Sequence, residues 1–269
     1  MLSKTVRVLG DAALVLLVLV ALLPFVFMAL TSLQRSNSIS LAFDFSKLDL
    51  TNYVRLFTEY GFARALMTSV IVVVLACTVN VFVCSLAAYA FAKKPFPGSE
   101  VLFWAYVATM MVPVQVTIIP LFTIMRDVGL LNTYVVLFLP VINAFGVFLI
   151  RQFMGNVPDE LLEAAKIDGA SDLRTFRSIV LPLIVPALVS LTIFTFITTW
   201  NDFLWPLIVT TDTQMQTVTL AAARMQGQFT TDYGLVMAGA TVSFIVPFVI
   251  YLLLQRQFVQ GVASAGLKG

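Results

Sequence analysis

The sequence contains no histidine, and this absence removes several kinds of catalytic site at once. Serine–histidine–aspartate and cysteine–histidine catalysis both need an imidazole, as does every histidine-containing metal site. Cysteine is also scarce, with Cys77 and Cys84 the two examples. Seven residues of helix rise about 10 Å, which is too far for a disulfide between them. We therefore interpret both cysteines as small apolar residues inside a helix.

Charge is the second scarce component of this chain. Charged residues make up 11% of the 269 residues, hydrophobic residues make up 60%, and the mean hydropathy is +0.98. This composition excludes an ordinary soluble globular protein. The 16 basic and 14 acidic residues leave a net charge of +2, so nucleic-acid binding has no electrostatic basis.

Long windows without Asp, Glu, Lys or Arg divide the chain. They cover 12–34, 65–92, 101–125, 128–150, 178–201 and 233–255. Each exceeds the about 20 residues that cross a hydrocarbon core as a helix. Helices are expected because backbone polar groups in lipid must be satisfied within the segment, and the alternation typical of a β-barrel does not occur.

The sequence thus predicts an all-α integral membrane protein, with one transmembrane domain over residues 1–269. We place six spans at about 12–34, 66–92, 101–125, 131–153, 182–209 and 234–256. The first apolar run is too long for a secretion signal and no Ala-x-Ala site follows it, so we interpret it as a retained anchor.

The distribution of basic residues predicts the orientation. Placing the N-terminus inside assigns ten of them to the cytoplasmic side: Lys4, Arg7, Lys93, Lys94, Arg151, Lys166, Arg174, Arg177, Arg256 and Lys268. Six fall outside: Arg35, Lys47, Arg55, Arg64, Arg126 and Arg224. Because cytoplasmic loops carry an excess of Lys and Arg, this bias predicts that both termini face the cytoplasm. The charge-dense loop 155–181 is then cytoplasmic, the outer loops are 35–64 and 211–233, and a tail covers 257–269.

The loop 155–181 carries signals for two short helices and a tight turn. Pro158 suits a first helical position, and Asp159 and Glu160 place negative charge in the first turn, where the helix dipole favours it. Gly169 fits the left-handed position that ends a helix, and Ser171 can cap the next one.

Leu173, Phe176 and Val180 follow at helical spacing, and we expect this stripe to face the membrane-side core. The small Ala164 and Ala165 allow the first helix to approach a groove closely, while Glu163 and Asp168 offer charges to basic residues of a partner. From the residues alone, an ordinary surface helix between two spans remains open.

The same loop reads Glu163-Ala164-Ala165, Asp168-Gly169-Ala170, Phe176, Ile179, Leu181-Pro182 and Pro186. These residues resemble the coupling-loop signature of inner-membrane permeases of binding-protein-dependent ABC importers. The resemblance implies a type I importer architecture in the cytoplasmic membrane of a bacterium or archaeon. It also implies that the following residues couple the chain to an ATPase: Glu163, Ala164, Ala165, Asp168, Gly169, Ala170, Phe176 and Pro182.

Further motifs resemble the carbohydrate-uptake branch of this family. They are Phe96-Pro97-Gly98, Met111-Val112-Pro113, Leu131-Asn132-Thr133-Tyr134 and the run from Trp200 to Pro206. The tail resembles the shorter permease of maltose-type systems, although Ala265-Gly266-Leu267-Lys268-Gly269 stands where a Gly-Ala-Val-Lys-Gly type of ending is expected. The resemblance spans most of residues 66–269.

No Gly-x-x-x-x-Gly-Lys-Ser/Thr loop occurs, so the chain cannot hydrolyse ATP itself. We expect no catalytic residues, no metal site and no cofactor in this chain. The resemblance implies two ABC ATPase subunits that bind ATP and Mg²⁺, a second permease subunit, usually a different chain, and a substrate-binding protein on the outer face.

The outer loop 211–233 is polar between two spans, and a plain solvated loop is one interpretation of it. By resemblance this loop could reach into the binding protein, with Arg224, Gln226, Gln228 and Asp232 as contacts. Neutral polar residues within the spans are candidates for the solute pathway, although each is also a plausible interhelical hydrogen bond. They are Asn80, Gln115, Asn143, Thr199 and Asn201. Pro113 and Pro120 are expected to kink the third span.

Three alternatives remain at this stage. A secondary transporter would need coupling-ion residues deep within the spans, and the six apolar windows contain no Asp, Glu, Lys or Arg. A membrane-embedded enzyme would need convergent acids, a histidine or a metal cluster. An importer for a non-sugar solute (a glycerophosphodiester, an amino acid or phosphate) stays within the family, since Trp200–Pro206 and the tail are the features that favour sugar.

Overall fold

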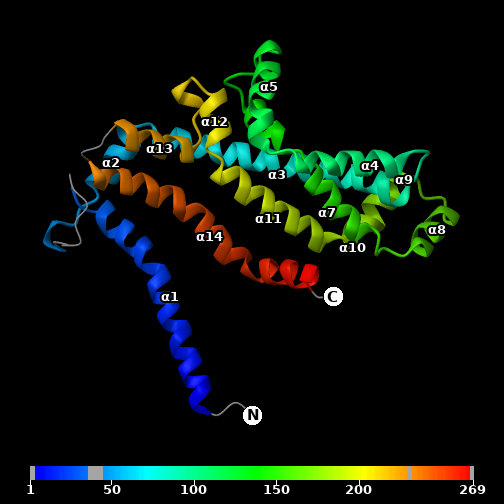
Figure 1. Ribbon diagram of the computed structural model, residues 1–269, viewed down its shortest axis with the longest axis horizontal. Coiled ribbons are helices and arrows are strands. Elements are labelled where there is room, and N and C mark those ends of the chain that lie inside the picture. The colour runs from blue at the N-terminus through cyan, green and yellow to red at the C-terminus, as the bar shows by residue number, and fades with distance from the viewer. Residues whose placement is uncertain (1–3, 36–44, 229–231, 267–269) are drawn as a thin grey trace. The chain divides into compact units, whose positions relative to one another are not determined.

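The computed structural model describes residues 4–35, 45–228 and 232–266. It divides the chain into two compact units, residues 1–63 with 220–246 and residues 64–219 with 247–269. Helices form almost all regular structure of the described residues (Figure 1).

The first unit combines the N-terminal part of the chain with residues 220–246. It contains α1 (Lys4–Ser32), the 3₁₀ turn η1 (Phe45–Lys47), α2 (Thr51–Thr58), most of α13 (Val218–Gln228) and the first part of α14 (Tyr233–Gly266). α1 leaves its apolar side chains exposed from Val8 to Leu23, as expected of a surface that meets lipid. Phe25 stacks on Phe244 with ring centroids 4.4 Å apart, which joins α1 to α14.

The second unit is a bundle around the long helix α3 (Phe62–Lys93). Its other helices are α4 (Ser99–Ala108), α5 (Val114–Asp127), α6 (Tyr134–Phe138), α7 (Ala144–Met154), α8 (Asp159–Ile167), α9 (Asp172–Thr175), α10 (Leu181–Leu183), α11 (Val185–Asn201) and α12 (Leu204–Val209). The 3₁₀ turns are η2 (Thr109–Met111), η3 (Leu139–Val141) and η5 (Thr213–Met215), and η4 (Phe176–Val180) is a π-helical turn.

Three helices are each long and apolar enough to cross a membrane: Val8–Ser32, Phe62–Lys93 and Tyr233–Leu253. Three further stretches reach this length only as pairs of helices, and the pairs bend by 103°, 49° and 78° at their breaks. By length and composition the described residues therefore allow up to six crossings.

The 103° bend separates α4 with η2 from α5, which projects from α4 (Figure 1). It falls at Pro113, as predicted, because proline disfavours helix at the residue before it, and Val112 is extended with φ −82° and ψ 119°. Pro120 lies inside α5. The 49° bend precedes Asn143, whose side chain accepts a hydrogen bond from the Gly146 backbone N–H at 3.3 Å and so starts α7.

One buried cluster joins α3, α4, α7 and α11 to the loop 155–181. It contains Cys84, Ala88, Tyr89, Phe103, Val147, Ile150, Met154, Val157, Phe176, Val180, Ile184, Ala187 and Leu191. A second cluster joins α3, α5, α6 and α12 through Val72, Met125, Val136, Leu137, Trp205 and Val209.

Gly146 packs closely against Cys84 and Leu191 of the first cluster, and this gives a prediction. A Cβ built there lies 2.5 Å from Cys84 Sγ and 3.3 Å from Leu191 Cδ1, whereas a Cβ at Gly10 meets nothing within 4 Å. We expect Gly146→Val to destabilise the fold by about 1–3 kcal/mol through overpacking. Thermal unfolding of the detergent-solubilised chain should show a lower midpoint for this variant than for Gly10→Ala. Equal midpoints would contradict the close packing.

Candidate coupling site and outer segment

The loop 155–181 forms the predicted helix, turn and helix. α8 spans Asp159–Ile167, with Pro158 as the residue before its first turn rather than within it. Gly169 has a φ of +76°, in the left-handed region that favours glycine, as predicted. The Ala170 backbone N–H donates to the Ala165 carbonyl at 2.9 Å, and that of Gly169 donates to Lys166 at 3.1 Å. These bonds satisfy the last carbonyls of α8 and close the turn tightly.

The second helix begins at the predicted cap. The Ser171 hydroxyl accepts a hydrogen bond from the Arg174 backbone N–H at 3.4 Å. Phe176 and Val180 enter the buried cluster, as expected, but Leu173 is 69% exposed, so the predicted stripe is wrong at that residue. The π-helical turn changes the register, because its i→i+5 bonding turns Phe176 and Val180 toward the same side as Thr175.

The tip of this segment presents most of the predicted coupling residues to solvent. Ala165 is buried against the bundle, whereas Glu163, Ala164, Asp168, Gly169 and Pro182 are exposed and Ala170 is half-buried. Beside the turn, Ile167 is 86% exposed, so two large apolar side chains, Ile167 and Leu173, flank Gly169 in the open. Exposed apolar surface next to acidic groups is suited to a protein partner.

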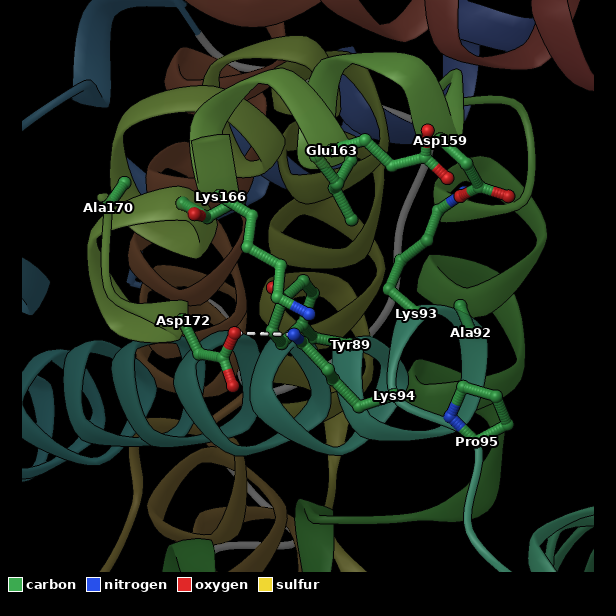
Figure 2. A pocket seen from close by; sticks show the side chains of 12 residues that line it. Tyr89, Ala92, Lys93, Lys94, Pro95, Asp159, Glu163, Lys166, Ala170 and Asp172 are labelled. Atoms are coloured by element: carbon green, nitrogen blue, oxygen red, sulfur yellow. Dashed lines mark hydrogen bonds and ion pairs between the residues drawn. The ribbon is translucent and has the colours of Figure 1, made fainter. Parts of the chain in front are cut away.

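Two adjacent lysines at the end of α3 hold both helices of the segment. The Lys93 ammonium donates to the Val157 carbonyl and to Asp159 Oδ1, each at 2.6 Å, and its side chain is 5% exposed. Lys94 forms an ion pair with Asp172 at the start of α9 (Figure 2). The hydrogen bond to Asp172 raises the pKa of Lys94. We call Lys93, Lys94, Asp159 and Asp172 the lysine clamp.

The clamp borders a pocket of about 330 Å³ between α3 and the segment. Figure 2 shows Glu163 and Lys166 directed over this space from α8, with Tyr89 at its floor. In the sequence only charge points to the clamp: two lysines follow a span directly, and acidic residues begin both predicted helices. The lysines indicate the orientation of the chain, but no periodic pattern reveals their partners.

A further ion pair ties α4 to α7. Arg151 Nη2 lies 2.6 Å from Glu100 Oε2, and the Arg151 guanidinium carbon is 3.8 Å from the centroid of the Phe103 ring. Glu100 also accepts a hydrogen bond from the Trp104 indole at 2.8 Å. Glu100 lies in the first turn of α4, a few residues after Lys93 and Lys94. Arg151 lies in the last turn of α7, so this ion pair, like the clamp, joins the ends of helices.

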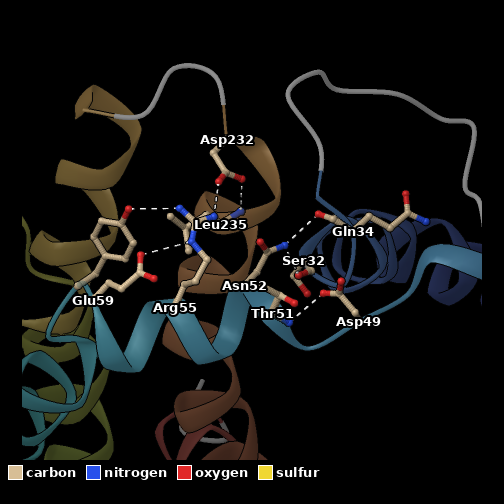
Figure 3. Close-up of polar contacts among 10 residues, drawn as sticks. Ser32, Gln34, Asp49, Thr51, Asn52, Arg55, Glu59, Asp232 and Leu235 are labelled. Carbon is tan, nitrogen blue, oxygen red and sulfur yellow. Dashed lines mark hydrogen bonds and ion pairs between the residues drawn. The ribbon is translucent and has the colours of Figure 1, made fainter.

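In the first unit, half-buried Asp232 takes part in a network of polar contacts, and its contact with a binding protein stays a prediction (Figure 3). Arg55 Nη1 donates to Asp232 Oδ2 at 2.7 Å, and this hydrogen bond raises the pKa of Arg55. Asp232 Oδ1 accepts from the Leu235 backbone N–H at 3.1 Å, which caps α14. Asn52 donates to the carbonyls of Ser32 and Gln34, both at 2.9 Å. These contacts fix the ends of α1, α2 and α14 to each other.

The other predicted binding-protein contacts lie on α13. Arg224 is half-buried and Gln226 is exposed. The Gln228 side chain and residues 229–231 lie outside the described residues, as do Lys268 and Gly269 of the tail. The tail region predicted from residue 257 continues α14 as helix to Gly266.

The predicted pathway residues do not gather at one site. Asn80 donates to Thr195 Oγ1 at 2.9 Å and accepts from Cys84 at 3.1 Å, both contacts buried, so it joins α3 to α11. Asn143 caps α7, and exposed Asn201 donates back to the Ile197 carbonyl. Thr199 is buried, with no hydrogen-bond partner for its hydroxyl. Gln115 lines a pocket at the start of α5.

Comparisons with known proteins agree with this geometry. The family described as "Binding-protein-dependent transport system inner membrane component" matches residues 80–264. The chain is 34% identical over 245 residues to the arabinooligosaccharides transport system permease protein AraQ of Halalkalibacterium halodurans, covering 89% of this chain and 86% of that protein. It is 41% identical over 189 residues to the sn-glycerol-3-phosphate transport system permease protein UgpE of Salmonella typhi, covering 69% and 67%.

A solved structure shares the fold. The crystal structure of a bacterial ABC transporter that imports the acidic polysaccharide alginate matches with a TM-score of 0.79 at 23% identity, covering 95% of this chain and 98% of that one. The matched family region includes the helix–turn–helix segment, its clamp partner Lys93 and the bent spans. The chain therefore belongs to the binding-protein-dependent transport system inner membrane components, the permease subunits of ABC importers.

Proposed function

We propose that this chain is one of two permease subunits of a sugar importer, and that α8 and its Gly169 turn dock into a cytoplasmic ATPase subunit. The observation that carries the proposal is an exposed tip of acidic and apolar side chains mounted on the bundle by the lysine clamp. ATP and Mg²⁺ are bound by the ATPase subunits, and a solute-loaded binding protein docks on the opposite face.

The charge arrangement supports six crossings with both termini inside. Lys93, Lys94 and Arg151 all form ion pairs at the end of the second unit that carries the segment. Clustered Lys and Arg at one end of membrane helices are typical of the cytoplasmic side. Asp159 and Asp172 also lie in the first turns of α8 and α9, where the helix dipoles favour negative charge.

A displacement of α8 and its Gly169 turn would be transmitted to the spans through two sets of contacts. The lysine clamp connects both short helices to α3, and Phe176, Val180 and Ile184 connect the segment to α7 and α11 through the buried cluster. Closing of the ATPase pair on ATP would then move the segment and the spans together. Alternating access needs a ligand with different affinities for the two states, and the loaded binding protein supplies that difference.

The names of the relatives support a sugar or sugar-like solute. One transports arabinooligosaccharides and the similar solved structure imports alginate, while a third carries sn-glycerol-3-phosphate. The similarity to the last, at 41% identity, favours a glycerol phosphate ester, a class that includes glycerophosphodiesters, as the second candidate.

A matched pair of glycines tests the docking role. Gly169 and Gly129 have φ values of +76° and +72°, and neither has an atom within 4 Å of a built Cβ. Aspartate at either position therefore costs a similar backbone strain of about 1–2 kcal/mol. We expect Gly169→Asp, like Glu163→Lys, to lose co-purifying ATPase subunits or ATP-driven uptake, whereas Gly129→Asp keeps both. Normal assembly and transport by Gly169→Asp would refute docking at this turn.

A charge swap tests whether the clamp transmits motion. Lys94 and Asp172 are largely exposed, and such pairs contribute at most about 1 kcal/mol to stability. We expect Lys94→Asp to reduce ATP-driven uptake several-fold with an unchanged unfolding midpoint, because like charges then push α9 from α3. Adding Asp172→Lys should restore uptake. Arg126→Asp, in the exposed pair with Asp127, is the control. Uptake that is insensitive to Lys94→Asp would remove the clamp from the mechanism.

The outer segment 211–233 gives a separate test. We propose that it contacts the binding protein through α13 and the residues that follow it, with Arg224, Gln226, Gln228 and Asp232 as candidates, and that the Asp232–Arg55 pair fixes its base. Deleting residues 229–231 together with Gln226→Ala should abolish stimulation of ATPase activity by the loaded binding protein while basal activity stays. Gln152→Ala, an exposed glutamine on α7, should leave stimulation intact. Full stimulation after the deletion would exclude the role.

A further inference from the structure

A second pocket lies at the far end of α11 from the loop 155–181, which the proposed function makes the coupling segment. It has a volume of about 250 Å³ and is bounded by α5, the α6–η3 turn and the α11–α12 turn. Its lining is Val114, Gln115, Thr117, Ile118, Leu121, Leu137, Pro140, Val141, Asp202, Leu204 and Trp205. The pocket therefore includes part of the Trp200–Pro206 motif, to which no role has yet been assigned.

The polar groups of this pocket are few and of different kinds. Asp202 is half-buried, and its Oδ1 accepts a hydrogen bond from the Trp205 backbone N–H at 3.4 Å. Thr117 donates its hydroxyl proton to the Val114 carbonyl at 2.8 Å, so its oxygen is left as an acceptor. Gln115 is exposed and carries both a donor and an acceptor. A carboxylate, a hydroxyl oxygen and an amide on apolar walls are suited to binding hydroxyl groups.

Trp205 supplies a fixed aromatic surface to the pocket. It is buried, and its indole N–H donates to the Val136 carbonyl at 2.7 Å, which anchors it to α6. The indole polar group is thereby satisfied, so the part of the ring that borders the pocket acts as apolar surface. Ligand sites of this kind combine a mostly apolar lining with a few placed polar groups.

The size limits what the pocket can hold. Pockets for drug-sized ligands have about 300–1,000 Å³, so this one fits a single ring-sized unit of a longer solute. α11 has 17 residues and is about 25 Å long, so the pocket lies about that far from the start of α11 next to the coupling segment. In the proposed orientation this is the outer side, where a solute leaves the binding protein.

We propose that this pocket is a solute subsite of the permease and that it selects neutral sugar rings, with Asp202 accepting hydroxyl protons and Trp205 lining the apolar face. The inference rests on the proposed function, because it assumes that the solute passes this chain. An anionic solute such as a uronate or a phosphate ester meets the Asp202 carboxylate as a like charge and is disfavoured. The subsite therefore favours the sugar candidate over the glycerophosphodiester.

The test uses the complete importer in lipid nanodiscs without binding protein, titrated with arabinotriose, maltotriose and trigalacturonate by calorimetry. We expect a neutral trisaccharide to bind the wild type and trigalacturonate to bind more weakly.

The variant Asp202→Asn keeps the acceptor for the Trp205 N–H but removes the charge. The affinity for the neutral trisaccharides should therefore weaken about tenfold, and their preference over trigalacturonate should shrink. Thr117→Val, on the surface of α5, should also weaken neutral binding. Asp127→Asn, at the exposed end of α5, should match the wild type.

The outcomes separate this inference from the function on which it depends. Absence of binding by both neutral trisaccharides, equal binding of trigalacturonate, or an unchanged affinity in Asp202→Asn would each overturn the subsite. ATP-driven uptake by the wild type in proteoliposomes with its binding protein is measured alongside. If the binding results contradict the subsite but uptake is normal, the importer function stands. If the wild type takes up no solute with ATP and binding protein, both the subsite and the importer function are overturned.

Discussion

The structure depends on one constraint, the exclusion of charge from long apolar helices. Lipid cannot solvate ions, so charged groups gather at helix ends, where they find partners. At the end of α3 this places Lys93 and Lys94 beside Asp159 and Asp172, the acids that open α8 and α9. The same distribution that permits insertion thus attaches the coupling segment to the bundle. A mechanical connection between a cytoplasmic partner and a span needs such an attachment, and the apolar cluster around Phe176 reinforces it.

The breaks in the spans follow from a second constraint, that every backbone N–H in lipid needs an acceptor. Pro113 has no N–H to satisfy, and Asn143 satisfies Gly146 with its side chain, so the chain can bend at both places. Bent helices leave gaps where straight ones would pack. The 250 Å³ pocket lies beside these two bends. Of its polar lining residues, Gln115 and Thr117 lie in the first turn of α5, just after Pro113, and Asp202 lies in the α11–α12 turn.

Much of this could be predicted from the sequence, because the signals involved are local. The cap at Ser171, the left-handed Gly169 and the bend at Pro113 each depend on one residue and its neighbours. The errors and omissions concern contacts between distant segments. Leu173 is exposed because a π-helical turn alters the register. The ion-pair partner of Asp232, Arg55, lies 177 residues away in the chain, so the sequence does not reveal this pair. The partners of Lys93 and Lys94 were likewise beyond the reach of helical periodicity.

α11 connects the two sites proposed for this chain. Ile184, next to its first residue, belongs to the cluster that receives the coupling segment, and Asp202, just past its last residue, borders the second pocket. Between them Asn80 and Thr195 join α11 to α3 by a buried hydrogen bond, so the two helices cannot slide freely past each other. In the proposed mechanism, a displacement at the π-helical turn passes through Ile184 and the 78° bend into α11. The pocket would change shape in step with the ATPase, which is what release of a solute during each cycle requires.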